Sequence, residues 1–171
     1  NIQPERMIMS LLYQGKINIT ASVDSGRDVT YNYNYDVDGT WVSNNNLALS
    51  GTDTWAKANA ATNNPIEILL EAKEYMAEKY GVTVTRALMN TATLKNMLLS
   101  ESIKKAMNPL GASSIILTTA QAKAYVETET GLTIMTYDKM FKNEEQVDTK
   151  FYPDNYVTLL PGYSLGNTWY G

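Results

Sequence analysis

Two runs of alternating apolar and polar residues near the start of the chain constrain its fold more than any other feature. Side chains in a β-strand point to opposite faces in turn, so a strand with one buried face has a period of two residues. The apolar positions are Ile17, Ile19, Ala21 and Val23 in the first run and Val29, Tyr31, Tyr33, Tyr35 and Val37 in the second. The segment DSGRD between the runs contains a glycine, so residues 17–37 are predicted to form a β-hairpin with a five-residue turn.

Helical spacing precedes this hairpin. Residues 5–13 have apolar side chains at intervals of three and four, which predicts a helix that ends near Gly15. Its predicted buried face consists of Met7, Ile8, Leu11 and Leu12.

A second helix is predicted between residues 65 and 80. Asn64 can accept a hydrogen bond from a free amide of the first turn, Pro65 suits the first helical position, and Glu67 has capping-box spacing. Gly81 is predicted to end the helix. Its predicted buried stripe consists of Ile66, Leu69, Leu70, Met76, Ala77 and Tyr80.

The segment between the hairpin and this helix, residues 38–63, is polar and has no sustained period, which predicts a loop. Four large apolar side chains are expected to hold the loop on the domain: Trp41, Leu47, Leu49 and Trp55.

The second half of the chain also contains both helical and strand-like spacing of apolar residues. Residues 82–90 are predicted to form a buried strand, and residues 91–108 one helix or two short ones. A helix capped by Thr118 and Gln121 is predicted to end at Gly131.

The tail is expected to be a hairpin, in which residues 132–141 pair with residues 155–161 across the charged turn 142–150. Strands and helices therefore alternate along the chain without a strict βαβ repeat. This order favours an α+β fold in which helices flank a mixed β-sheet.

The residue types that are missing narrow the chemistry. The 171 residues include no cysteine and no histidine, which removes thiolate nucleophiles, cysteine zinc sites and the commonest proton-transfer group at neutral pH. We therefore expect a protein that is not an enzyme and that holds no cofactor and no metal. A chain of this length buries roughly 70% of its unfolded surface, which suffices for one core without disulfides.

Charge and hydropathy exclude other classes. The net charge of −4 leaves no broadly basic surface for nucleic acid. No apolar run approaches the roughly 18 residues that a membrane helix needs, and no signal peptide opens the chain, so we expect no membrane partner and an intracellular site of synthesis. Because the chain starts at Asn1 rather than at methionine and stops abruptly at Gly171, we expect a fragment of a longer protein.

Residues 34–45 match the opening of a calcium-binding loop. Asn34, Asp36 and Asp38 occupy the first three ligand positions and Gly39 follows them. The twelfth position is Asn45, which cannot supply the bidentate carboxylate, and a strand precedes the segment instead of a helix. A chance match is the favoured interpretation.

Ser102 and Lys105 have the S-x-x-K spacing of penicillin-binding enzymes, but the other motifs of that class are missing. The favoured interpretation is that Ser102 caps a short helix and the neighbouring lysines face water. The glycosylation sequon at Asn18 lies within a predicted strand and is expected to be inert.

Two surfaces are candidates for contacts with other molecules. Tyr31, Tyr33 and Tyr35 form an aromatic row at strand spacing, which favours packing in a core or a subunit interface. The alternative is a platform that stacks sugars or bases, together with Trp41 and Trp55.

The second candidate surface is the charged hairpin tip at residues 142–150. Such a run is either a solvated tip or an intersubunit contact. Its candidate interface residues are Lys142, Asn143, Glu144, Glu145 and Lys150.

Several segments together carry a resemblance to a known family. They are RMIMSLLYQGKINI, YNYNYD, NNPIEILLEAK, TRALMNTATLKNML, GLTIMTYDKMF and the closing FYPDNYVTLLPGYSLGNTWYG. Their order over nearly the whole chain resembles the major capsid protein E family of tailed bacteriophages, the lambda-type branch of the Hong Kong ninety-seven capsid fold.

The resemblance implies two domains. An axial domain, in which helices flank a sheet, surrounds the capsomer axis, and a peripheral domain contains a spine helix and a β-sheet. On this basis residues of about 1–55 are expected to be mainly peripheral, with the end of the spine helix, a β-hairpin and a loop, and residues of about 56–171 mainly axial. The N-terminal arm, the extended loop and a C-terminal remainder of the family are expected to be absent from this chain.

The resemblance also implies the function. The chain is expected to be a structural virion protein of a phage or prophage, made in the host cytoplasm, that assembles into an icosahedral shell enclosing DNA. Its expected partners are copies of itself in hexamers and pentamers, and a scaffold, portal or decoration protein, with no small-molecule substrate and no sequence-specific DNA binding. A carbohydrate-binding module that uses the tyrosines and tryptophans is the alternative, and a Ser/Lys or metal-dependent hydrolase is a third hypothesis.

Overall fold

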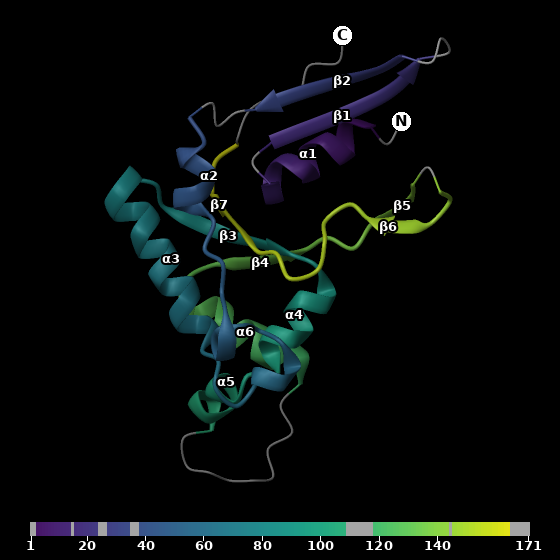
Figure 1. Ribbon diagram of the computed structural model, residues 1–171. Coiled ribbons are helices and arrows are strands. Elements are labelled where there is room, and N and C mark those ends of the chain that lie inside the picture. Colours follow the sequence, from purple (N-terminus) through teal and green to yellow (C-terminus); the bar gives the residue numbers. More distant parts are fainter. Residues whose placement is uncertain are drawn as a thin grey trace. The chain divides into compact units, whose positions relative to one another are not determined.

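The computed structural model describes residues 3–14, 16–23, 27–34, 38–108, 118–143 and 145–164 (Figure 1). The chain divides into two compact units. The first unit consists of Asn1–Ala48 and Asp138–Pro153, and the second of Leu49–Tyr137 and Asp154–Gly171. Both units are therefore built from two separate stretches of sequence.

The first unit contains two helices and two hairpins. Its helices are α1 (Gln3–Gln14) and α2 (Thr40–Asn45), and its strands are β1 (Lys16–Val23), β2 (Arg27–Asn34), β5 (Met140–Lys142) and β6 (Asp148–Lys150). β1 pairs with β2 and β5 pairs with β6, both antiparallel. The hairpin predicted from the period-two runs is thus confirmed.

The pairing extends further toward the turn than the sequence pattern indicates. Arg27 and Asp28 belong to β2 and lie opposite Val23 and Ser22. The predicted five-residue turn is therefore too long, because the ladder of backbone hydrogen bonds continues through polar residues as readily as through apolar ones. The far end of the predicted second strand, residues 35–37, lies outside the described residues, as does the predicted helix cap at Gly15.

Helix α1 forms as predicted, and of its predicted buried face Met7, Leu11 and Leu12 are half-buried whereas Ile8 is exposed. The side chain of Ile8 is 41% exposed. The helix contacts residues 138–153 through other positions, since the Arg6 guanidinium lies 4.6 Å from the Phe141 ring centroid and Tyr13 packs edge-on against Tyr152 at 6.0 Å. Ile8 is two positions from Arg6, or about 200° around the helix, and so points away from these contacts.

The described residues of the second unit form a small sheet and four helices. The sheet has the strand order β4 (Thr133–Thr136), β3 (Val84–Met89), β7 (Thr158–Pro161), in which β3 is parallel to β4 and antiparallel to β7. The helices are α3 (Pro65–Tyr80), α4 (Thr91–Leu98), α5 (Glu101–Met107) and α6 (Thr119–Thr130), and two 3₁₀ turns, Gly51–Asp53 and Lys57–Asn59, precede them. The predicted mixed α+β class is confirmed.

The predicted tail hairpin is wrong. Residues 132–141 divide into β4 and β5, and β7 joins β3 instead of pairing with either of them. Because β3 is the central strand, it provides both of its edges to the later strands, and β4 and β7 lie on opposite sides of it. The charged segment still forms a turn, between β5 and β6.

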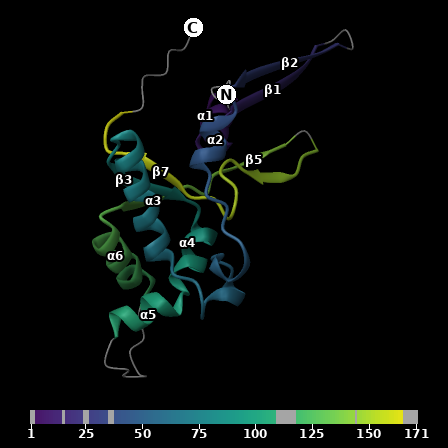
Figure 2. The same ribbon diagram turned by 60° about the vertical axis from the view of Figure 1, so that its left-hand side comes forward.

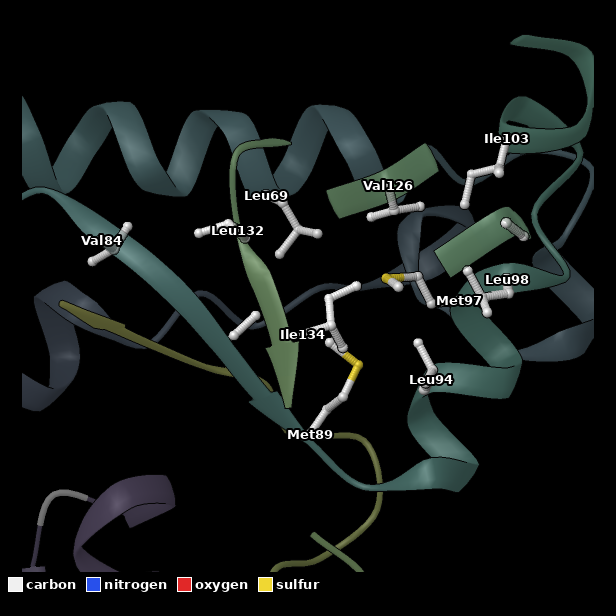
Figure 3. Packing of buried hydrophobic residues seen from close by; sticks show 12 residues of the cluster. Leu69, Val84, Met89, Leu94, Met97, Leu98, Ile103, Val126, Leu132 and Ile134 are labelled. Atoms are coloured by element: carbon white, nitrogen blue, oxygen red, sulfur yellow. The ribbon is translucent and has the colours of Figure 1, made fainter. Parts of the chain in front are cut away.

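One hydrophobic cluster holds the second unit together (Figure 3). All four helices and the two strands β3 and β4 contribute side chains to it, so the helices pack on one face of the sheet, as Figures 1 and 2 also show. The cluster consists of Leu69, Val84, Ala87, Met89, Leu94, Met97, Leu98, Ile103, Ala122, Val126, Leu132 and Ile134. Val84 and Ala87 share this face although they are three residues apart, because a register shift between Val84 and Arg86 changes the alternation of β3.

The helix boundaries of this unit follow the predicted caps. The Asn64 side chain accepts the amide hydrogen of Glu67, and Gly81 ends α3 in the left-handed conformation. Thr118 and Gln121 form the full capping box of α6. Within α3, however, Leu70 and Ala77 are exposed rather than buried, since the helix packs on the sheet through the neighbouring face that contains Leu69.

The segment predicted to be a loop contains the short helix α2 and the two 3₁₀ turns. Trp41 and Leu47 are 49% and 63% exposed, so the prediction that they hold the segment on the domain is wrong. Trp55 does pack against the core of the second unit. Single turns of helix without a sustained apolar stripe leave no period in the sequence, which explains the missed elements.

Candidate subunit interface

The β5–β6 hairpin presents most of the charged tip that the sequence singles out. Its turn is organised by Asn143, whose side-chain oxygen accepts the backbone amides of Glu145 and Val147 at 3.0 and 2.9 Å. The backbone amide of Asn143 donates to the Val147 carbonyl at 3.0 Å, and Gln146 has a φ of 61°. An asparagine side chain that accepts the backbone amides of its own turn stabilises that turn.

The exposed atoms of the tip are both charged and apolar. Lys142 forms an ion pair with Asp148 across the hairpin at 3.3 Å, and both side chains are largely exposed. Such a pair contributes at most about 1 kcal/mol because water and salt screen it. Met140 and Val147 are 50% and 54% exposed beside these charges. A surface of this mixed composition can exclude water from a contact and also select its partner by charge.

The base of the hairpin is firmly held within the first unit. Phe141 and Phe151 pack with ring centroids 4.7 Å apart, and the amide of Phe151 donates to the Lys139 carbonyl at 3.1 Å. The Lys139 ammonium also forms an ion pair with Glu5 of α1. The tip is thus an exposed turn on a packed aromatic base.

The predicted interface residues are partly brought together. Lys142, Asn143, Glu145 and Lys150 all lie in this hairpin, with Lys150 opposite Met140 in the strand pairing. Glu144 lies outside the described residues.

The predicted aromatic row lies on another hairpin of the same unit. Tyr31 and Tyr33 are opposite Ile19 and Ile17 in the β1–β2 ladder, and Tyr35 lies outside the described residues. The alternative stacking platform also requires Trp55, which packs against the hydrophobic core of the second unit. Trp55 is therefore a core side chain and not part of an exposed platform.

The calcium-like segment does not form a calcium-binding loop in the part that the structure describes. Gly39 precedes α2 with a φ of 68°, and Asn45, at the twelfth position, lies within that helix and donates its side-chain amide to the Trp41 carbonyl at 2.8 Å. Residues 35–37 lie outside the described residues. Among the described residues no group of three or more acidic side chains is placed to hold a metal ion.

The S-x-x-K pair is not arranged as a nucleophile and its base. Ser102 lies within the first turn of α5 and shares a 2.7 Å hydrogen bond with Ser100, and Lys105 forms an ion pair with Glu101 at 3.5 Å. Ser100, not Ser102, precedes the helix, and its hydroxyl donates to the Asn63 carbonyl at 3.1 Å. The prediction that Ser102 caps the helix is therefore wrong, and Ser100 at the N-cap position makes no side-chain hydrogen bond to the first turn because its hydroxyl bonds to Asn63. The lysines Lys104 and Lys105 are exposed, as predicted.

A buried polar network in the second unit was missed by the sequence analysis. The Asn90 side-chain oxygen accepts the amide and the hydroxyl of Thr93 at 2.9 and 2.8 Å, and its amide group donates to Asp154. The Thr93 hydroxyl in turn accepts the amide of Asn155 at 2.9 Å, and Asn155 has a φ of 65°. This network joins the end of β3 to the turn before β7. The sequence signal was the polar residues within the segments LMNTAT and YPDN, which stand beside apolar ones.

These features define an α+β protein whose β5–β6 hairpin exposes both charged and apolar side chains. No curated protein matches the chain. The family model of phage major capsid protein E matches residues 2–171, and the chain therefore belongs to this family. It is a structural capsid subunit that assembles with copies of itself into the shell of the virion, and the family identified from the sequence is confirmed.

The family is structural rather than enzymatic. In the described part of the chain, no helix has the length and hydropathy required to cross a membrane.

Proposed function

We propose that this subunit has the Hong Kong ninety-seven-like fold and forms the hexamers and pentamers of an icosahedral phage head. The observation that carries the proposal is the division into two units in a chain of the capsid family. The second unit, a mixed sheet with helices packed on one face, corresponds to the axial domain. The first unit, with α1 and the two hairpins, corresponds to the peripheral domain.

Residues 138–153 belong to the peripheral domain in this assignment, whereas the family resemblance implied that residues of about 56–171 are mainly axial. The β5–β6 tip then belongs to the part of the subunit that meets neighbouring capsomers. We assign the tip residues Lys142, Asn143, Glu145 and Lys150 to a contact with another copy. Glu144, Tyr31, Tyr33 and Tyr35 are proposed to take part in contacts of the same kind.

The strength of each contact can be modest. A shell subunit binds several neighbours at once, so the free energies of weak contacts add within one assembled particle. Repeated identical contacts need complementary surfaces on one chain and no reactive group. The net charge of −4 is consistent with a container that encloses DNA without binding it tightly. Scaffold, portal and decoration proteins are the further partners proposed, and the host cytoplasm is the proposed site of synthesis.

Replacement of Val147 by lysine tests the tip. Val147 is 54% exposed, so the change should leave the fold of the subunit intact while it places a charge in the contact. Leu47→Lys is the matched control, because Leu47 lies in the same unit and is 63% exposed. We expect Val147→Lys to reduce the yield of shells in negative-stain images and in sedimentation, and Leu47→Lys to assemble like the wild type.

Wild-type capsid protein that stays monomeric at high concentration, with and without scaffold, would contradict the proposed function itself. If both variants assemble equally well, the tip is not part of a subunit contact, and the proposed shell function is unaffected.

A further inference from the structure

We propose that, in the assembled shell, the outer face of α3 binds the basic corner around the α4–α5 junction of a second copy of the chain. The outer face of α3 is defined here as Leu70, Glu71, Glu74, Tyr75 and Glu78, and the basic corner as Lys57, Lys95 and Lys104. The contact rests on the proposed self-assembly and specifies one of its interfaces.

The outer face of α3 contains a row of acidic side chains. Glu71, Glu74 and Glu78 are separated by three and four residues, so they lie on the same side of the helix. All three are exposed. Among the described residues none of the three has an ion-pair partner.

This arrangement is unfavourable for a helix that faces only water. Like charges at a spacing of three or four residues repel one another and destabilise the helix that carries them. A solvated helix is better stabilised by opposite charges at these spacings. A complementary surface on another molecule would relieve the repulsion along the acidic row.

Apolar side chains flank the acidic row on both sides. Leu70 is 41% exposed and Tyr75 is 38% exposed. Leu70 precedes Glu74 by four residues, and Tyr75 follows Glu71 by four, so each borders the row. Exposed apolar side chains can exclude water from a contact, and charges beside them can select a partner of opposite charge.

A complementary basic surface lies elsewhere on the same unit. Lys95 is exposed on α4, Lys104 is exposed on α5, and Lys57 is exposed on the 3₁₀ turn Lys57–Asn59. Within the described part of the chain these three lysines have no ion-pair partner either.

The three basic segments meet at the α4–α5 junction. The amide of Glu101 donates to the Ala60 carbonyl at 2.7 Å, and the Ser100 hydroxyl donates to the Asn63 carbonyl at 3.1 Å. These bonds hold the segment that follows Lys57 against the start of α5.

Among the described residues no ion pair joins the acidic row to the basic corner of the same copy. Helix α6 packs against both α3 and α4, so the two surfaces belong to different helices of the second unit. Two copies can therefore join head to tail, with the acidic row of one copy on the basic corner of the other. A head-to-tail contact of this kind closes into a ring when repeated by rotation.

A double variant, Glu71→Lys with Glu78→Lys, tests whether the outer face of α3 is an interface or is simply exposed to water. Both lysines then lie three or four residues from Glu74, so the helix gains two favourable pairs and the isolated subunit should become slightly more stable. The same change reverses the charge that the basic corner would meet, and we expect the concentration required for assembly to rise about tenfold or more. Asp53→Lys with Glu129→Lys is the control with an equal change of net charge at exposed positions of the same unit, and it should assemble like the wild type.

The reciprocal double variant, Lys95→Glu with Lys104→Glu, should impair assembly to a similar degree. A chain that contains all four substitutions has both surfaces reversed and should recover assembly. Measurement by sedimentation velocity and negative-stain microscopy at low salt gives the greatest sensitivity, because salt screens the contact.

Recovery by the fourfold variant would establish the contact. Normal assembly of the α3 variant, or no recovery in the fourfold variant, would overturn it. Either of these results with a wild type that forms shells leaves the proposed function intact, whereas a wild type that never assembles contradicts the proposed function.

Discussion

Asn90 provides the most informative perturbation of the fold. It is fully buried at the end of β3, where it caps α4 through the Thr93 amide and donates to Asp154 before β7. One side chain thus joins a strand, a helix and a turn that are far apart in the sequence. We expect Asn90→Ala to destabilise the chain strongly although the substitution removes no apolar atoms from the core.

The size of the destabilisation follows from the hydrogen bonds that the partners of Asn90 lose. Loss of the helix cap, which leaves the Thr93 amide without its acceptor, costs about 1 kcal/mol. The hydroxyl of Thr93, which is itself buried, also loses its acceptor, and a buried group left without its hydrogen bond costs about 1–3 kcal/mol. Asp154 is exposed and can bind water instead. The sum is about 3 kcal/mol, and at about 2–4 °C per kcal/mol for a chain of this size the Tm should fall by roughly 6–12 °C.

The exchange of donor and acceptor tests the reasoning directly. Asn90→Asp keeps the acceptor for Thr93 but places two carboxylates together, so this variant should also be unstable. Addition of Asp154→Asn restores a donor opposite the new carboxylate and should recover most of the loss. Urea titration and hydrogen exchange at the Thr93 amide measure the effect. An Asn90→Ala chain within about 0.5 kcal/mol of the wild type, or an exchanged pair no more stable than Asn90→Asp, would refute the network.

Two further predictions concern the ends of helices. At Gly131 the φ is 66° and an added Cβ would lie 2.9 Å from the Lys73 ammonium, so Gly131→Ala should cost about 1–2 kcal/mol in urea unfolding. Gly81→Ala, at a φ of 65° with open space around the Cβ, should cost less, and equal losses would show that the close contact contributes nothing. The pKa of Lys79 is raised above 10.5, mainly because its ammonium donates a hydrogen bond to the Tyr75 hydroxyl. This raised pKa favours the folded state below pH 10.5 and its contribution disappears as the pH rises through the folded-state value. Tyr75→Phe should lower the pKa of Lys79 in an NMR titration, and an unchanged value would exclude the bond as the cause.

The elements that the sequence predicted well are those with local signals. The caps at Asn64 and Thr118 and the glycines that end α3 and α6 are set by residues a few positions apart, and the structure confirms them. The β1–β2 hairpin also joins neighbouring segments. Pairing between distant segments has no such signal, which is why β7 was predicted to pair with the wrong partner. The parallel contact between β3 and β4 is created by the helices between them and not by any turn residue.

The turn that contains the candidate interface residues was predictable for the same reason, whereas their role in an interface stays a prediction. The charged run that includes Lys142 and Asp148 is contiguous, so it could be recognised as an exposed turn. The acidic row of α3 escaped notice because the expected buried stripe included Leu70, which the structure exposes beside Glu71 and Glu74. Which flank of an amphipathic helix is buried depends on the sheet it packs against. That information is absent from the helix itself.

The division of both units into two sequence segments has a consequence for synthesis. The ribosome completes Asn1–Ala48 early, but the remainder of that unit, Asp138–Pro153, emerges after nearly all of Leu49–Tyr137. The second unit in turn needs the strand that follows Asp154. Neither unit can be finished on a nascent chain that is still short, so we expect the proposed contact surfaces of both units to form together and late. Growing chains on one polysome are therefore expected to associate less with one another before they are released.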